Sequence, residues 1–144
     1  MAKKLAVVTI LGLFAFTAKA APRPTNLNAN QAQAVVTQVF DHVRDRNEVS
    51  GVELSKRFSS ALRQSGFATK TVYLTKGHAS TGIKIRGPGP DYLQEAPLNY
   101  HVVTIVRLIG GWRVVDPVVL RDARLEPFKI WQHRIESPVE MSVK

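Results

Sequence analysis

Residues 99–117, NYHVVTIVRLIGGWRVVDP, decide the fold of this chain. β-Branched and aromatic residues dominate 100–108 and 112–115, which is typical of strands, and Gly110-Gly111 marks a turn between them. The stretch therefore predicts a β-hairpin with His101 near its start and Asp116 at its end.

The connection between the two strands decides whether His101 and Asp116 meet. They are fifteen positions apart, so any connection with an even number of residues places them on the same face of the hairpin. A two-residue turn formed by the glycine pair alone sets Asp116 opposite Ile105, about 13 Å along the strand from His101. A four-residue connection beginning at Leu108 sets it opposite Val103, about 7–8 Å from His101 on the diagonal. The sequence leaves both registers open, and only the second lets the carboxylate orient the imidazole.

The first twenty residues have the pattern of a secretory signal peptide. Lys3 and Lys4 form a positive start, residues 5–16 are almost wholly apolar, and residues 18–20 (AKA) match a signal peptidase site. An apolar run of about a dozen residues is too short to cross a bilayer as a helix. We therefore expect a periplasmic or secreted protein that starts at Ala21 and has no stable membrane insertion. A buried N-terminal helix is the alternative interpretation.

The mature chain is basic. Removal of the signal peptide takes away three lysines and lowers the formal net charge from +9 to +6. The remaining Lys and Arg are scattered among Asp and Glu, without the concentrated patch that nucleic-acid binding needs. We therefore expect no nucleic-acid partner and favour a protein or peptide ligand of acidic character, or an anionic envelope surface. The sequence leaves the oligomeric state open.

The chain has no cysteine, which restricts the chemistry it can perform. Disulfides, a lipid anchor on a cysteine, a thiolate nucleophile and a cysteine metal site are all excluded. His42, His78 and His133 share no metal-ligand spacing with one another or with acidic residues. We therefore expect no metal site and no cofactor.

The rest of the chain predicts one α+β domain over residues 29–144, after a mobile lead-in at 21–28. Apolar residues at spacings of three and four indicate amphipathic helices, and alternating β-branched or aromatic residues indicate strands. The expected helices are a first one capped by Asn30 and reaching Val43, a second from Ser50 to Ser65 that buries Leu54, Phe58, Ala61 and Leu62 and stops at Gly66, and a short third one at 126–135. The expected strands are 69–75, 100–108 and 112–115, with a short one at 83–86 inside the irregular segment 77–97.

Three stretches resemble the transglutaminase-like, papain-related enzymes. The hairpin, HVV…GGWRVVDP, is similar to the family's signature of His, strand, turn, strand and Asp-Pro. Residues 116–131 (DPVVLRDARLEPFKIW) are similar to its run of Asp-Pro, Pro and Trp. Residues 61–74 (ALRQSGFATKTVYL) are similar to the end of its nucleophile-bearing helix and the following strand. Over about residues 48–131, the chain most resembles the secreted bacterial protein-glutamine deamidases (protein glutaminases).

This resemblance implies a papain-like or transglutaminase-like core, with N-terminal helices packed on an antiparallel sheet, and catalytic roles for His101 and Asp116. In the family a cysteine starts the helix some fifteen residues before the glycine that ends it. Here that count leads to the pair Ser50-Gly51. Ser50 is the nearest hydroxyl, in the place of the nucleophile, and Ser55 lies one turn further in. A serine alkoxide is much harder to form than a thiolate.

Two functions therefore remain open. We favour a non-catalytic relative of the protein-glutamine deamidases that binds a protein or peptide, and the alternative is an amidohydrolase using Ser50 with His101 and Asp116. In both cases we expect the His101 and Asp116 side chains to face each other near the start of the Ser50 helix. Without the resemblance, His101 is a strand histidine bonded to backbone and Asp116 an ordinary turn former before proline.

If the protein is exported, its mature form should have one defined N-terminal residue. Mass spectrometry of the protein recovered from cell fractions should find Ala21 as the first residue, because cleavage follows the small-x-small site. An intact Met1 in every fraction would contradict the signal-peptide assignment.

Overall fold

The computed structural model describes residues 29–44, 50–78, 80–89 and 98–144. The predicted signal peptide and lead-in lie outside these residues. The elements in chain order are α1 (Ala29–Arg44), α2 (Gly51–Gln64), β1 (Thr69–Lys76), β2 (Tyr100–Leu108), β3 (Gly111–Val115), α3 (Pro117–Leu120), β4 (Leu125–Pro127), α4 (Phe128–Gln132) and β5 (Val139–Val143). Within the described part of the chain, no helix combines the length and apolar character needed to span a membrane.

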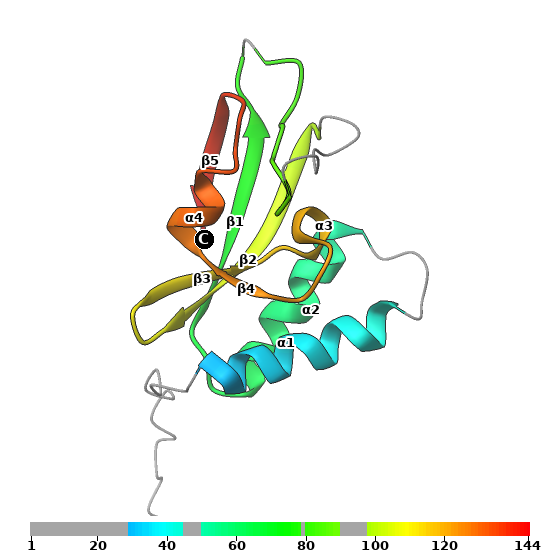
Figure 1. The fold of residues 1–144 in the computed structure, drawn as a ribbon, viewed down its shortest axis with the longest axis vertical. Helices are drawn as coiled ribbons and strands as arrows, with labels where there is room; N and C mark the ends of the chain where they lie inside the picture. The colour runs from blue at the N-terminus through cyan, green and yellow to red at the C-terminus, as the bar shows by residue number, and fades with distance from the viewer. Residues whose placement is uncertain (1–28, 45–49, 79, 90–97) are drawn as a thin grey trace, which may run out of the picture.

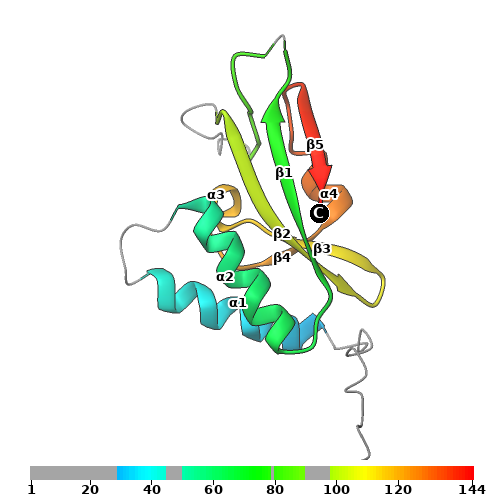
Figure 2. The ribbon, with the colours of Figure 1, turned by 180° about the vertical axis from the view of Figure 1, so that it is seen from behind.

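The predicted α+β class is confirmed: among the described residues, four helices accompany a five-stranded antiparallel sheet in the order β4-β3-β2-β1-β5. Helices α1 and α2 lie on one side of this sheet and α4 lies on the other, as the two opposite views show (Figures 1 and 2). Each side has its own group of buried apolar side chains. The sheet therefore separates two cores.

Helix α2 follows the predicted pattern at both ends. The Ser50 side chain accepts a hydrogen bond from the Glu53 backbone N–H and caps the first turn. At the other end Ser65 is the C-cap, and Gly66 has φ of 89°, the left-handed conformation that glycine adopts without strain. Phe58 and Leu62, one turn apart, are 1% and 0% exposed and belong to the core on the α1–α2 side. α2 is thus held by its apolar stripe.

Strand β2 is buried on both faces and divides its side chains between the two cores. Val106 and Leu108 pack in the core formed with α1 and α2. Val103 and Ile105 pack in the core on the α4 side. Because successive side chains of a strand point to opposite faces, this assignment also fixes the direction of every other residue in β2.

The hairpin adopts the register that brings His101 and Asp116 together. Leu108 pairs with Gly111, and Thr104 pairs with Val115, so Asp116 follows at the level of Val103. The loop itself is Ile109 and Gly110, one residue earlier than a turn made by the glycine pair alone. Gly110 and Gly111 have φ of 88° and 130°, a conformation in which other residues are strained.

The segment after Asp116 differs from the prediction. Residues 126–135 were expected to form one short helix, but Glu126 lies in strand β4 and helix α4 spans only Phe128–Gln132. Pro127 ends the strand and is the N-cap of α4, because a proline cannot donate to a further ladder bond. The one-turn helix α3 and the edge strand β5 were not predicted from the sequence.

Three further local features differ from those predicted. Asn30 was expected to cap the first helix, but α1 begins at Ala29 and Asn30 lies inside its first turn. The short strand at 83–86 is present as two isolated bridges, Ile83 to Leu98 and Ile85 to Ile135. Ala61 was expected on the sheet side of α2, and it instead lines a groove toward α1.

Packing of α2 on the sheet predicts a large loss of stability in Leu62→Ala. Leu62 is fully buried, so the substitution should lower the free energy of unfolding by about 2–5 kcal/mol, measured by urea denaturation. The control is Val52→Ala on the same helix, where the side chain is 37% exposed and the loss should stay within about 0.5 kcal/mol. Equal losses in the two variants would contradict this packing.

Candidate functional site

Asp116 lies at the centre of the candidate site. The residue caps α3, and its Oδ1 accepts a hydrogen bond from the Val119 backbone N–H at 3.3 Å. Its Oδ2 accepts two more, from His101 Nε2 at 2.9 Å and from Trp131 Nε1 at 2.8 Å. The carboxylate is 1% exposed, and an isolated charge at such a position would be strongly destabilising. Three donors offset that cost.

His101 enters the site from β2, on the neighbouring strand of the hairpin. It is 4% exposed, and because an ionised carboxylate can only accept, its Nε2 is the donor toward Asp116. The aspartate therefore fixes the orientation of the imidazole, as the sequence analysis expected of the pair.

Trp131 of α4 closes the site on the side opposite β2. Its ring is fully buried and lies 6.5 Å from the His101 ring, with 25° between the two planes. Phe128 stacks on Trp131 at 5.8 Å. The indole thus covers the histidine–aspartate pair and donates to it at the same time.

Asp116 lies near the start of α2, as expected of the pair, but the His101 side chain points away from that helix. Thr104, three residues after His101, faces α2 and bonds with Ser55, so strand alternation turns His101 to the opposite face of the sheet. There its neighbours are Trp131 and the core on the α4 side. Asp116 directs its carboxylate to that same face. The His101 ring and α2, the helix expected to bear the nucleophile, therefore lie on opposite faces of the sheet.

Ser50, in the expected place of the nucleophile, is an exposed helix cap. Its hydroxyl oxygen accepts from Glu53 N at 3.2 Å, and its carbonyl accepts from Leu54 N at 2.9 Å. Asp116 and Gly51 both line a void between α2 and the sheet, but this void measures only about 10 Å³, scarcely room for one water. The structure joins His101 to Asp116 and does not join Ser50 to either.

Ser55 connects α2 to strand β2 through hydrogen bonds with Thr104. Thr104 Oγ1 donates to the Ser55 carbonyl at 2.8 Å. A threonine hydroxyl has one proton, so the second contact, 2.8 Å between the two hydroxyl oxygens, is donated by Ser55. Both groups are buried. The Ser55 hydroxyl therefore has no proton free for a base to remove.

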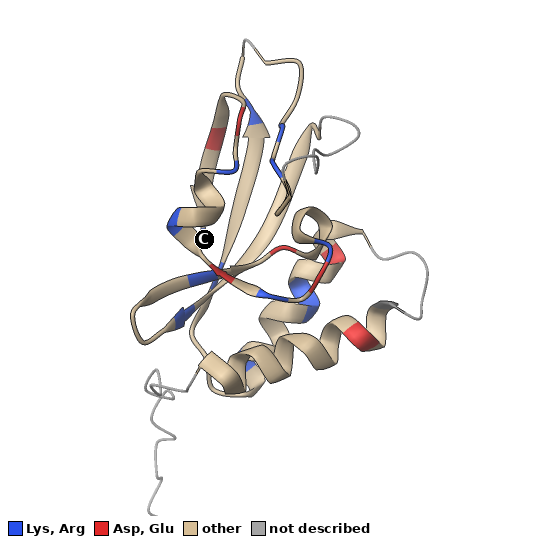
Figure 3. Ribbon diagram, viewed as in Figure 1, with Lys and Arg blue, Asp and Glu red and all other residues tan. Residues whose placement is uncertain are grey.

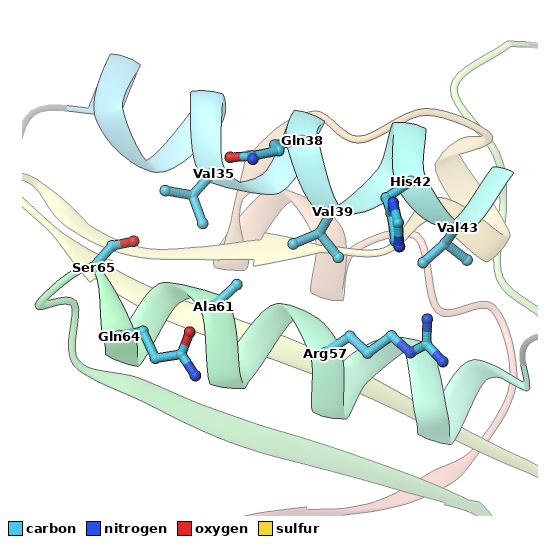
Figure 4. Close-up of a pocket in the computed structure, with 9 residues that line it drawn as sticks. All are labelled: Val35, Gln38, Val39, His42, Val43, Arg57, Ala61, Gln64 and Ser65. Carbon is cyan, nitrogen blue, oxygen red and sulfur yellow. The ribbon is translucent and has the colours of Figure 1, made fainter. Parts of the chain in front are cut away.

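A separate groove lies between α1 and α2 (Figure 4). Its volume is about 440 Å³, within the range of ligand-binding pockets. Four small apolar side chains form one part of the lining and five polar ones the rest: Val35, Val39, Val43 and Ala61, then Gln38, His42, Arg57, Gln64 and Ser65. His42 is exposed and points into this groove.

A second ion pair supports the segment that carries Trp131. Arg134 donates to both carboxylate oxygens of Glu126 and also to the carbonyl of Gly87. The hydrogen bond with Glu126 raises the pKa of Arg134. A fork of this kind is geometrically specific, and it fixes the segment after α4 against β4.

Comparison with protein-family models, with curated proteins and with solved structures found no match for this chain.

Sequence reasoning did not predict the hydrogen-bond partners of three residues of the polar interior: Trp131, Ser55 and Thr104. Trp131 was matched to the Trp of the family's run, and Ser55 was named only as a hydroxyl one turn into the helix. One signal was available, because a buried indole N–H needs an acceptor and Asp116 is among the few carboxylates of the mature chain. The Ser55–Thr104 pair carries no signal of this kind, since serine and threonine occur on helices and strands for many reasons.

Because the Asp116 carboxylate accepts a hydrogen bond from Trp131, we expect Trp131→Phe to destabilise the fold. The variant loses the donor to Asp116 and part of the ring, so the free energy of unfolding should fall by about 2–4 kcal/mol. The other tryptophan offers a matched control: Trp112 is half-buried, and Trp112→Phe should cost less than about 1 kcal/mol. Urea unfolding followed by far-ultraviolet circular dichroism measures both. Similar losses would refute the special role of the Trp131 N–H.

Proposed function

We propose that this chain is an exported, non-catalytic relative of the protein-glutamine deamidases that binds a protein or peptide. The single observation that carries the proposal is the enclosure of the His101–Asp116 pair. Both side chains are at least 96% buried, and Trp131 covers them. A substrate amide would have to reach an imidazole that lies within the core.

The hydrogen bonds of the Ser50 and Ser55 hydroxyls support the same proposal. Nucleophilic catalysis needs a nucleophile within hydrogen-bond reach of its base, about 2.6–3.2 Å. The Ser50 hydroxyl caps α2 and accepts from Glu53 N, and Ser55 donates its proton to Thr104. The amidohydrolase alternative requires a contact between Ser50 and His101, and no hydrogen bond joins these two side chains among the described residues.

The molecule also offers surface for a ligand. The groove between α1 and α2 is open to solvent, and a second groove lies on the other side of α2. Both are formed by helix α2, which the Ser55–Thr104 pair and the Phe58 and Leu62 side chains fix on the sheet. A rigid surface of this kind loses little entropy when it binds.

An ammonia-release assay on a glutamine-rich protein tests the proposal. The wild-type protein should release no ammonia above the buffer rate, while an active protein-glutamine deamidase serves as the positive control. The informative variant is Ser50→Asn, because asparagine keeps a cap acceptor for Glu53 N and removes the hydroxyl. Ammonia release by the wild type that disappears in Ser50→Asn would overturn the proposal and establish the amidohydrolase. Release that appears only in Ser50→Cys would show that the remaining geometry still supports chemistry.

A further inference from the structure

A polar groove lies between α2 and β1, on the side of α2 away from α1. Its volume is about 320 Å³, and its lining consists of Lys56, Ser59, Ser60, Arg63, Gln64 and Thr71. The described residues that form this lining include two cations, three hydroxyls and an amide, but no carboxylate. The groove therefore presents hydrogen-bond donors and positive charge together.

Helical spacing brings these side chains to one side of α2. Lys56, Ser60 and Arg63 follow one another at intervals of four and three residues, the spacing of neighbours on a helix surface. The two cations are thus about 10 Å apart along the helix axis. Arg63 donates through its Nε to Thr69 Oγ1 at 2.7 Å, which holds the guanidinium beside the sheet. Figure 3 shows Lys and Arg segments on α2.

A third cation, Lys144, pairs through its backbone with Thr71, a residue of the groove lining. Thr71 exchanges backbone hydrogen bonds with Lys144, at 2.9 Å and 2.8 Å, and Lys144 Nζ lies 5.3 Å from the centre of the Tyr73 ring. Thr71, Tyr73 and Lys144 lie on the face of the sheet that α2 covers. Glu140, a carboxylate on the same face of β5, lies toward the opposite end, level with Thr75.

We propose that this groove binds an extended, acidic peptide segment of a protein partner. The proposal rests on the binding function proposed above and names the surface and the ligand class. Lys56 and Arg63 would donate hydrogen bonds to the carboxylates of the peptide, and the Ser60 and Thr71 hydroxyls would donate to the same oxygens. An extended peptide rises about 3.3 Å per residue, so the spacing of the two helix cations corresponds to about three residues.

The described lining of this groove has no aromatic side chain, which favours a peptide over a nucleic acid. Single-stranded nucleic acids bind to grooves in which bases stack on open aromatic rings. Here the Tyr73 ring is engaged by Lys144, and Tyr100 lies against it at 6.2 Å with a 38° tilt. Because both residues contact the Tyr73 ring, that ring is not open for a base to stack on. Carboxylates need no such platform.

Fluorescence anisotropy with a labelled (Glu-Thr)₆ peptide tests the proposal on the full mature protein. The peptide should bind the wild type, its (Gln-Thr)₆ analogue should bind at least about tenfold more weakly, and added salt should weaken the binding. The groove variant is Lys56→Glu with Arg63→Glu. The control is Lys84→Glu with Lys129→Glu, which makes the same change of net charge at two exposed lysines outside the groove. Circular dichroism confirms that both variants fold.

The groove variant should lose binding at least about tenfold, and the control should stay within about twofold of the wild type. Equal losses in the two variants, or equal binding of the neutral peptide, would show attraction by net charge alone and overturn the proposal. Stronger binding of a single-stranded oligonucleotide that depends on Tyr73 would also overturn it. The ammonia assay on the same samples separates the two proposals: ammonia release refutes the non-catalytic function, whereas absence of both release and peptide binding refutes only the groove.

Discussion

The buried carboxylate of Asp116 is the constraint on which the rest of this structure depends. A charge that is 1% exposed is tolerated only when its oxygens are satisfied, and its three donors come from β2, α3 and α4. Satisfying it therefore requires the hairpin in one register, a helical turn directly after it, and a tryptophan from fifteen residues further on. The two carboxylate oxygens of Asp116 thus hold β2, α3 and α4 in one relative position, which apolar packing alone would not specify.

The second organising feature is the division of β2 between two cores. Thr104 faces α2 and bonds with Ser55, while His101 faces α4 and lies beside Trp131. This division has a chemical consequence. Helix α2, whose start could supply a nucleophile, packs on one face of the sheet. The His101 side chain points to the other face. The polar groups at both places stabilise the fold, and each already has its partners.

A chain whose polar interior is closed can still act through its surface. Helix α2 has an apolar face on the sheet and a polar face between two grooves, one toward α1 and one toward β1. The groove toward β1 gathers Lys56 and Arg63 with three hydroxyls, and Lys144 approaches from the edge strand. Although the basic residues are scattered along the sequence, folding concentrates some of them beside one helix. This concentration is what gives the positive net charge a place to act.

The sequence by itself determined the α+β class, the extent of α2, and the shared face of His101 and Asp116, because helical periodicity, Ser50 and Gly66 as end signals, and strand alternation are local properties. It left two hairpin registers open, since both satisfy the same alternation. Tertiary structure decided between them: the observed register brings Asp116 within reach of Trp131, a partner that no local pattern identifies. Tertiary structure also decided which face α2 covers. Both faces of β2 are apolar enough to be buried, so only the packing of the whole domain could assign His101 to the side away from the helix.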